Sequence, residues 1–416
     1  MKIPRQCAIL VGGLGTRLGS LTADTPKPLL DCGGRPFLAW VLRELSRFGI
    51  TDIVLLAGYK SERTESFCRA AASWLPKPLS ISVSVEPSPA GTGGALWHAR
   101  HLLEDTFLVI NGDSWIDVNL ARFFARAAAP PEMAGSVLLR SMPDCSRYGR
   151  VELEGERIVA LHEKSPLSGP GLINGGLYIF DRSVLAQLSP LCSLEREILP
   201  ALAREGRLSG CVLDGYFIDI GIPSDYERAG VELPRRLLRP AIVFEAGVLL
   251  DQPDSLAEGQ DRIPWKPGAV DAIRMANDSG IHAFLVAART GDSCAEISGE
   301  DLKELSSRVN NDLLAYGATI DEMHIVAAPD RIPECFSEAS ARPEPTIDML
   351  LDLARRWGVD PKCRVLIGER TMANGANLGA PAHFSEGGNI LDLARPLIFE
   401  LDRQRTDELR QAGSSR

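Results

Sequence analysis

The chain has 416 residues, of which 45% are hydrophobic and 24% are charged, so we expect a folded protein that is too long for one ordinary core. Two domains are the expected division. The formal net charge of −10 argues against general nucleic-acid binding, which needs a basic surface. Any anionic ligand must therefore be bound by a few local cations.

The sequence lacks targeting and metal-binding patterns. No apolar run is long enough to cross a bilayer, and the amino terminus enters a glycine-rich loop too early for a signal peptide. The nine cysteines are scattered, without a C-x-x-C pair or a Cys/His group at metal-ligand spacing. Reduced thiols are the simplest interpretation, and we expect a cytoplasmic protein that contacts no membrane.

The first predicted element is a β-strand at residues 8–11, which runs directly into a glycine-rich loop. Gly12, Gly13 and Gly15 allow backbone N–H groups to converge on an anion. Thr16 adds a hydroxyl donor. The loop is therefore expected to bind phosphates, although it matches neither the Walker loop nor the Rossmann fingerprint.

Two cations follow the glycines. Arg17 presents a planar guanidinium that can hold two phosphate oxygens, and Lys27 lies between Pro26 and Pro28, which stiffen its backbone. A fixed ammonium suits charge that develops in a transition state. GGLGTRL followed by PKP resembles the sugar-1-phosphate nucleotidyltransferases, whose fingerprint is this pair of motifs. The resemblance implies a Rossmann-like α/β domain with a mixed sheet of the GT-A kind.

A helix and a second strand come next. The apolar spacing of residues 37–48 predicts a helix that Gly49 ends, and residues 53–57 are typical of a buried strand. Strand, helix and strand in this order form a right-handed parallel unit, which puts the phosphate loop at the carboxyl edge of the sheet. Ligands are expected at that edge.

Residues 79–85 alternate as a strand and lead into EPSPAGTGGAL, where we expect a helix to begin at Ala95. Gly91 and its neighbouring glycines allow a flat ligand to lie close to the backbone, and the resemblance implies a base-binding loop. Glu86 is a candidate for base recognition, since a carboxylate accepts from both N1–H and N2–H₂ of guanine and fits uracil or thymine less well. This argument favours GTP; the alternative is a solvated glutamate at a strand end.

Two aspartates are candidate Mg²⁺ ligands. Asp113 ends the apolar strand that starts at Phe107, at the edge where active sites of open α/β sheets lie. Asp219 lies between Ile218 and Ile220, in a segment too apolar to bury a charge without a function. The alternative for Asp113 is an aspartate that only caps a turn.

A hairpin is predicted at residues 146–166, and it leads to Glu163 and Lys164. Their carboxylate and ammonium suit the hydroxyls and the phosphate of a sugar phosphate. The resemblance places an EKP sequence here, and Ser165 separates the pair from its proline. The alternative is a solvated surface pair.

Gly149 and Asn174 are further candidates for binding the sugar phosphate. The stretches SRYG, GLINGGLYIF and YFIDIGIPSDY look closest to D-glycero-D-manno-heptose 1-phosphate guanylyltransferases. The resemblance covers about residues 5–232 and implies a nucleotidyltransferase domain at residues 1–232.

A basic, proline-bounded linker is expected at residues 233–240. A second α/β series follows at residues 241–395, and a charged helical tail that frays at residues 396–416. The series predicts a smaller doubly wound domain. It resembles phosphatases of the haloacid-dehalogenase (HAD) type that act on heptose 1,7-bisphosphate.

The HAD-like half is expected to be catalytically inactive. Those phosphatases need an aspartate nucleophile, a second aspartate, a lysine and acidic Mg²⁺ ligands. Their second motif is reduced here to Ala287 and Ala288, and Cys335 and His324 have no partners at the spacing of the zinc loop. The positions that match the catalytic groups hold Glu245, Gly247, Arg342 and Glu369.

The expected reaction joins a sugar 1-phosphate, with the heptose favoured, to GTP and releases pyrophosphate for surface polysaccharide synthesis. Mg²⁺ would offset repulsion between the two anions, and Lys27 would act at the α-phosphate. Mannose, glucose or N-acetylhexosamine 1-phosphate with UTP or dTTP, a surviving phosphatase, and a binding role for the second half are the alternatives. The sequence leaves open whether the chain forms a homo-oligomer.

Overall fold

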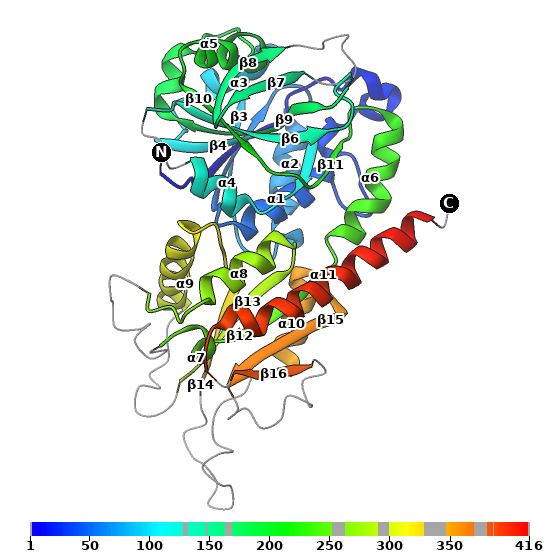
Figure 1. The fold of residues 1–416 in the computed structure, drawn as a ribbon. Helices are drawn as coiled ribbons and strands as arrows, with labels where there is room; N and C mark the ends of the chain where they lie inside the picture. Colours follow the sequence, from blue (N-terminus) through cyan, green and yellow to red (C-terminus); the bar gives the residue numbers. More distant parts are fainter. Residues whose placement is uncertain are drawn as a thin grey trace, which may run out of the picture. The chain divides into compact units, whose positions relative to one another are not determined.

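The computed structural model describes residues 2–127, 132–146, 149–162, 169–251, 263–289, 299–327, 347–369, 381–385 and 387–414. The chain divides into two compact units, unit 1 (Met1–Pro234) and unit 2 (Arg235–Arg416), each with its own sheet (Figure 1). In the described part of the chain, no helix has the length and apolar character needed to cross a membrane.

Unit 1 is a mixed α/β fold. Its strands are β1 (Gln6–Leu10), β2 (Asp52–Ala57), β3 (Ser80–Val85), β4 (Thr106–Asn111), β5 (Ser114–Asp117), β6 (Gly135–Met142), β7 (Arg150–Glu154), β8 (Arg157–His162), β9 (Gly171–Asp181), β10 (Leu208–Val212) and β11 (Tyr216–Asp219). Among the described residues, nine of these form one sheet in the order β3-β2-β1-β4-β9-β6-β10-β8-β7. The first four of that order are parallel, whereas β9 is antiparallel to β4 and β6. Strands β5 and β11 pair separately and antiparallel.

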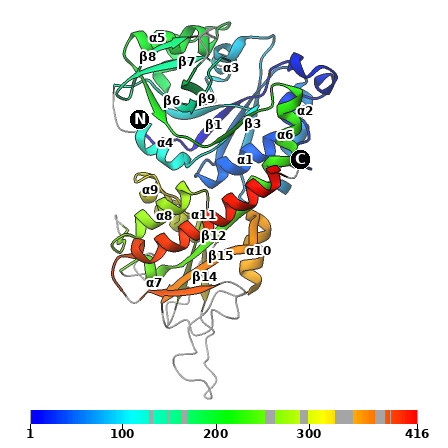
Figure 2. The same cartoon turned by 45° about the vertical axis from the view of Figure 1, so that its right-hand side comes forward.

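Helices cover both faces of this sheet. They are α1 (Phe37–Arg47), α2 (Ser61–Ala71), α3 (Gly91–Ala99), α4 (Leu120–Ala127), α5 (Leu199–Arg204) and α6 (Pro223–Arg236), with the short turns η1 (Thr16–Thr22), η2 (Lys27–Leu29), η3 (Ala72–Trp74), η4 (Arg182–Gln187) and the π-helical η5 (Leu194–Ile198). Figures 1 and 2 show α3 and α5 on one face and α1 and α4 on the other. Alternation along β1 explains the two layers, because Ala8 packs in the core under α3 and α5, while the buried Cys7 and Ile9 point the opposite way.

The first expected elements are confirmed. Strand β1 and helix α1 match residues 8–11 and 37–48, and β2 matches residues 53–57, each with a boundary shift of one or two residues. Gly49 has a φ of +81°, and the N–H of Ile50 donates to the carbonyl of Leu45, as expected where a glycine ends a helix.

Helix α3 begins at Gly91, and the expected start at Ala95 is wrong. The glycines are used for packing against the loop before η5. A Cβ on Gly93 would lie 2.6 Å from the sulfur of Cys192, and one on Gly94 would lie 2.8 Å from the carbonyl oxygen of Pro190. The N–H groups of Gly93 and Gly94 also donate to the carbonyl of Cys192. Close backbone approach therefore lets the helix start four residues early.

Unit 2 is a parallel α/β fold. Its described strands are β12 (Arg239–Glu245), β13 (His282–Arg289), β14 (Glu322–Ala327), β15 (Val359–Glu369) and β16 (Ala382–Ser385), and its helices are α7 (Ala246–Leu249), α8 (Ala269–Asp278), α9 (Gly299–Leu314), α10 (Ile347–Trp357) and α11 (Ile390–Ser414). The strands form one parallel sheet in the order β14-β13-β12-β15-β16. Ile242 and Phe244 face the core under α8, α9 and α11, and Ala241 and Val243 face α10. The expected second α/β unit is confirmed.

Two expected boundaries are corrected. The segment at residues 233–240 is not a separate linker, because α6 continues to Arg236 and β12 begins at Arg239. The expected tail boundary before residue 396 falls inside α11, where Ile398 and Leu401 are buried in the core of unit 2. Apolar residues among many charges hold this helix against the sheet.

Candidate active site

Unit 1 contains a cavity of about 770 Å³ at the carboxyl ends of β1 and β4. In an open α/β sheet this edge is where ligands bind. Most of the residues predicted for nucleotide and metal binding line it: Gly12, Gly13, Gly15, Thr16, Arg17, Lys27, Glu86, Gly91 and Asp113. Residues that lie far apart in the sequence are therefore brought together around one space.

The loop after β1 keeps its backbone open to the cavity. Gly15 has a φ of +63°, and a Cβ there would lie 2.9 Å from Cγ2 of Thr22, so a side chain is excluded by both strain and space. The Thr22 hydroxyl donates to the carbonyl of Gly15 at 3.1 Å. At Gly13, by contrast, no described atom lies within 4 Å of a Cβ position. This part of the loop can approach a ligand closely.

Lys27 lies between the two predicted metal ligands. Its Nζ is 2.6 Å from Oδ2 of Asp113 and 3.6 Å from Oδ1 of Asp219. Antiparallel pairing of β11 with β5 sets Asp219 opposite Ser114, and the N–H of Ile220 donates to the carbonyl of Asp113. The predicted convergence of these two aspartates is thus present in the structure, with a buried lysine between them.

The environment of Asp219 is unfavourable for a charge. Burial, and then the neighbouring Asp113 carboxylate, raises the pKa of Asp219, while Lys27 and Arg17 oppose this effect. Its buried Oδ1 accepts no hydrogen bond from any described residue. A carboxylate oxygen that is buried, unbonded and next to a second carboxylate fits a site for a hard divalent cation such as Mg²⁺.

Gly221 is a site residue that the sequence analysis missed. A Cβ at this position would lie 2.9 Å from Nη2 of Arg17 and 2.9 Å from Oδ1 of Asp219. Gly221 therefore lets the guanidinium and the carboxylate approach each other beside the cavity. The available signal was the spacing Asp-Ile-Gly directly after the predicted metal ligand.

Glu86 reaches the cavity from the end of β3. Its Oε2 accepts from the N–H of Ala90 at 3.2 Å, and Oε1 lies so close to Gly12 and Gly58 that a Cβ on either would crowd it. Burial raises the pKa of Glu86, although the hydrogen bond from Ala90 opposes this. Its carboxylate thus also fixes the loop before α3, and recognition of guanine stays a prediction.

The predicted sugar-phosphate residues are only partly described. Glu163 and Lys164 lie outside the described residues. Asn174 is described, but its Nδ2 donates to the Tyr178 hydroxyl at 2.8 Å and its Oδ1 accepts from Gly176, which places its amide in a bulge of β9. Neither Asn174 nor Gly149, which precedes β7, is among the described residues that line the cavity. Their assignment stays a prediction.

A second unpredicted residue is Glu195, which reaches the cavity from the π-helical turn η5. Its Oε2 accepts from the hydroxyls of Thr92 at 2.7 Å and Ser193 at 3.1 Å. The sequence indicated only the capped start of a helix here. π-Helical turns often occur at functional sites.

The phosphatase-like positions of unit 2 lie at the carboxyl edge of its sheet. Glu245 ends β12 and is buried, Gly247 is in α7, and Ala287 is close to the end of β13. Arg342 and Cys335 lie outside the described residues.

A glycine loop, an arginine, and a lysine between two aspartates in one cavity define a site for a substrate with several phosphates. Residues 7–236 match the family model described as nucleotidyl transferase, and the chain belongs to this family.

Relatives agree with this assignment. The chain is 36% identical over 231 residues to D-glycero-alpha-D-manno-heptose 1-phosphate guanylyltransferase of Aneurinibacillus thermoaerophilus, covering 55% of this chain and 98% of that protein. It is 37% identical over 228 residues to mannose-1-phosphate guanyltransferase beta-B of Xenopus laevis, covering 52% of this chain and 61% of that protein. The crystal structure of HddC from Yersinia pseudotuberculosis matches 54% of this chain and 97% of that chain, with 32% identity and a TM-score of 0.48.

Proposed function

We propose that unit 1 transfers a nucleotidyl group from a nucleoside triphosphate to a sugar 1-phosphate and releases pyrophosphate. The observation that carries this proposal is the Lys27 ammonium between Asp113 and Asp219, in a cavity bordered by the glycine loop. The names of the two guanylyltransferase relatives support the same reaction class.

Asp113 and Asp219 are the residues that would hold Mg²⁺. When bound, the ion supplies positive charge that offsets the repulsion between the triphosphate and the sugar phosphate. The site fits it because two carboxylates face one lysine and one carboxylate oxygen has no hydrogen-bond partner among the described residues.

The remaining work falls to residues of the chain. The backbone of Gly13 and Gly15 and the guanidinium of Arg17 hold the β- and γ-phosphates that leave as pyrophosphate. Lys27 stabilises the charge that develops at the α-phosphate. The attacking phosphate oxygen of the sugar 1-phosphate is already ionised, so no general base is needed, and the reaction depends on positioning and electrostatics.

We propose GTP and D-glycero-D-manno-heptose 1-phosphate as the substrates, in the synthesis of a surface polysaccharide. The relative from Aneurinibacillus thermoaerophilus carries both in its name, and Glu86 offers acceptors to the donor edge of guanine. Mannose 1-phosphate is the main alternative, because it appears in the name of the Xenopus laevis relative.

For unit 2 we propose a HAD-like domain without phosphatase activity. Glu245 stands where the nucleophilic aspartate is needed, and its additional methylene displaces the attacking oxygen by about one C–C bond length. A misplacement of this order can cost about 10²-fold in rate. Retained hydrolysis of heptose 1,7-bisphosphate is the alternative.

One panel tests these proposals. The purified chain is combined with each of four nucleoside triphosphates and several sugar 1-phosphates, and the release of pyrophosphate and of inorganic phosphate is measured separately. We expect Mg²⁺-dependent pyrophosphate release with GTP and the heptose, and no phosphate from heptose 1,7-bisphosphate. Phosphate release without pyrophosphate would place the activity in unit 2 and contradict the transferase.

Glu86→Gln tests the recognition of the base. Because glutamine replaces one acceptor with a donor, we expect the preference in kcat/KM for GTP over UTP to fall by about tenfold, since one lost hydrogen bond to a charged group is worth about 1.5 kcal/mol. Activity with UTP serves as the internal control. An unchanged preference shows that other groups read the base.

A further inference from the structure

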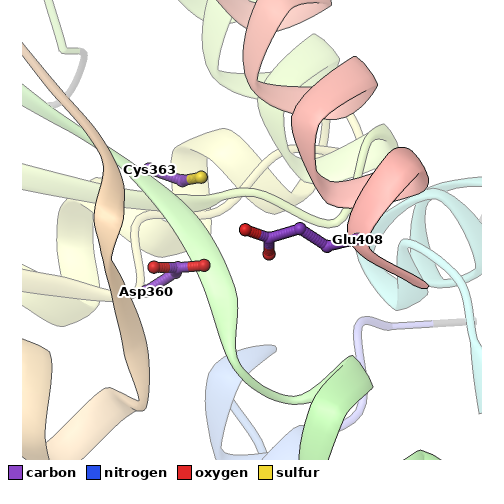
Figure 3. A group of neighbouring side chains, drawn as sticks. All are labelled: Asp360, Cys363 and Glu408. Atoms are coloured by element: carbon purple, nitrogen blue, oxygen red, sulfur yellow. The ribbon is translucent and has the colours of Figure 1, made fainter. Parts of the chain in front are cut away.

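Unit 2 contains a group of possible metal ligands that neither the transferase site nor the phosphatase-like positions include. The group consists of Asp360 and Cys363, from the first residues of β15, and Glu408 from α11. One ligand atom from each lies within 4.8 Å of the others. Figure 3 shows the sulfur and both carboxylates turned toward a common space.

A bulge in β15 brings the first two ligands together. Val359 pairs with Arg239 and Arg364 pairs with Ala241, so residues 360–363 stand opposite a single residue of β12. The extra residues protrude from the strand, as in other bulges that redirect side chains. The regular alternation of a strand is thereby broken, which allows the side chains of two residues three apart to meet Glu408.

Two of the three ligands are buried. Cys363 is 4% exposed and Asp360 is 7% exposed. The Cys363 thiol makes no hydrogen bond to any described residue outside this group, which points its sulfur at the two carboxylates and nothing else. Burying a carboxylate and a thiol together is unfavourable unless a proton or a cation lies between them.

The group also opens to solvent. A cavity of about 370 Å³ is lined by Lys362, Cys363, Gln404, Asp407 and Glu408. This cavity gives an ion a path of entry and leaves room for a water molecule to complete its coordination.

We propose that Asp360, Cys363 and Glu408 bind one divalent cation of the zinc class. A sulfur ligand selects borderline-soft ions such as Zn²⁺ over Mg²⁺ and Ca²⁺, which prefer oxygen alone. Three protein ligands and one water complete a tetrahedron. The ligand atoms must approach by about 1 Å to reach Zn–S and Zn–O bond lengths, and the exposed Glu408 side chain can make this movement.

Binding would connect α11 to β15 and stabilise unit 2. The ion binds the folded unit, in which the ligands converge, in preference to the unfolded chain. The effect is independent of nucleotidyl transfer, so it can be measured without a substrate.

The test is a titration of the full-length, metal-free chain with Co²⁺ in the presence of excess Mg²⁺. We expect one equivalent to bind with a thiolate-to-cobalt charge-transfer band, and Zn²⁺ to displace it. Cys363→Ser should abolish the band, and Glu408→Gln should weaken Co²⁺ binding by at least about tenfold. Cys68→Ser and Glu400→Gln, which change a cysteine and an exposed glutamate outside the group, should leave both unchanged.

Thermal unfolding provides a second readout for a variant that folds normally. Zn²⁺ should raise the unfolding temperature of the wild type and of Glu400→Gln but not of Glu408→Gln. A glutamine can still donate to Asp360, so a carboxyl pair that merely shares a proton would show no charge-transfer band and no response to zinc. That result, or an unaltered band in Cys363→Ser, would overturn the proposal.

Discussion

The missing methyl group of Gly221 sets the distance between two charged side chains of the site. A Cβ here would crowd Nη2 of Arg17 and Oδ1 of Asp219, both at the ends of flexible side chains. Because these ends can move, alanine should fit without damage to the fold but displace the groups that position the phosphates.

Gly221→Ala should therefore lower kcat by about 10²-fold, the cost of a misplacement on the order of 1 Å, while the unfolding temperature stays unchanged. Steady-state pyrophosphate release and thermal unfolding check this. Gly230→Ala in α6 is the control, since a Cβ there makes only an ordinary 3.8 Å contact and should leave both quantities unchanged. A loss of stability in Gly221→Ala, with no loss of kcat, would contradict the positioning role.

Single residues were predictable where the chemistry is local. The glycine loop, Arg17 and Lys27 lie within one short motif, and their residue types alone indicate phosphate binding. The position of Lys27 between two aspartates was not predictable, because it depends on the pairing of β11 with β5 across about a hundred residues. Likewise, nothing in the local sequence of Asn174 indicates that its amide is used inside a bulge.

At the scale of elements, Glu322 on β14 connects the sheet of unit 2 to α10. Its carboxylate accepts two hydrogen bonds from Arg356 at 2.7 and 2.8 Å and a third from the indole of Trp357. Burial raises the pKa of Glu322, but the hydrogen bonds from His324, Arg356 and Trp357 outweigh it and lower the pKa from 4.5 to about 2.

A lowered pKa in the folded state means that the ionised carboxylate stabilises unit 2 above pH 4.5, and that this stability is lost as the pH falls toward 2. Glu322→Gln should lower the free energy of unfolding at neutral pH by about 2 kcal/mol, and the difference from wild type should shrink below pH 4.5. Urea unfolding at several pH values measures this. A difference that does not depend on pH would show that the charge is unimportant.

The sequence predicted elements well where their apolar period was clear, as in α1, and less well where tertiary contacts decide. Three glycines at the start of α3 look like a loop in isolation, and only the packing of Cys192 explains why they are helical. In α11 the many charges predict a fraying tail, yet a few apolar residues at helical spacing join the core.

At the scale of the whole molecule, unit 1 matches nearly the full length of the relative from Aneurinibacillus thermoaerophilus. The cavity and all of its described lining residues belong to unit 1. A chain of residues 1–236, which retains α6, should therefore fold and release pyrophosphate with a kcat close to that of the full chain.

Circular dichroism and steady-state kinetics on the shortened chain check this expectation. Loss of activity in a shortened chain that folds would mean that unit 2 contributes to catalysis, and the assignment of the reaction to unit 1 alone would be wrong.

The most direct test of the central claim is pyrophosphate release by Asp113→Asn and Asp219→Asn beside Asp105→Asn, an exposed aspartate at the other end of β4. We predict that both site variants lose activity, whereas Asp105→Asn keeps it. We further predict that Asp219→Asn unfolds at the same or a higher temperature than wild type, because its raised pKa means that the fold disfavours the charge. Full activity in either site variant would contradict the proposed enzyme.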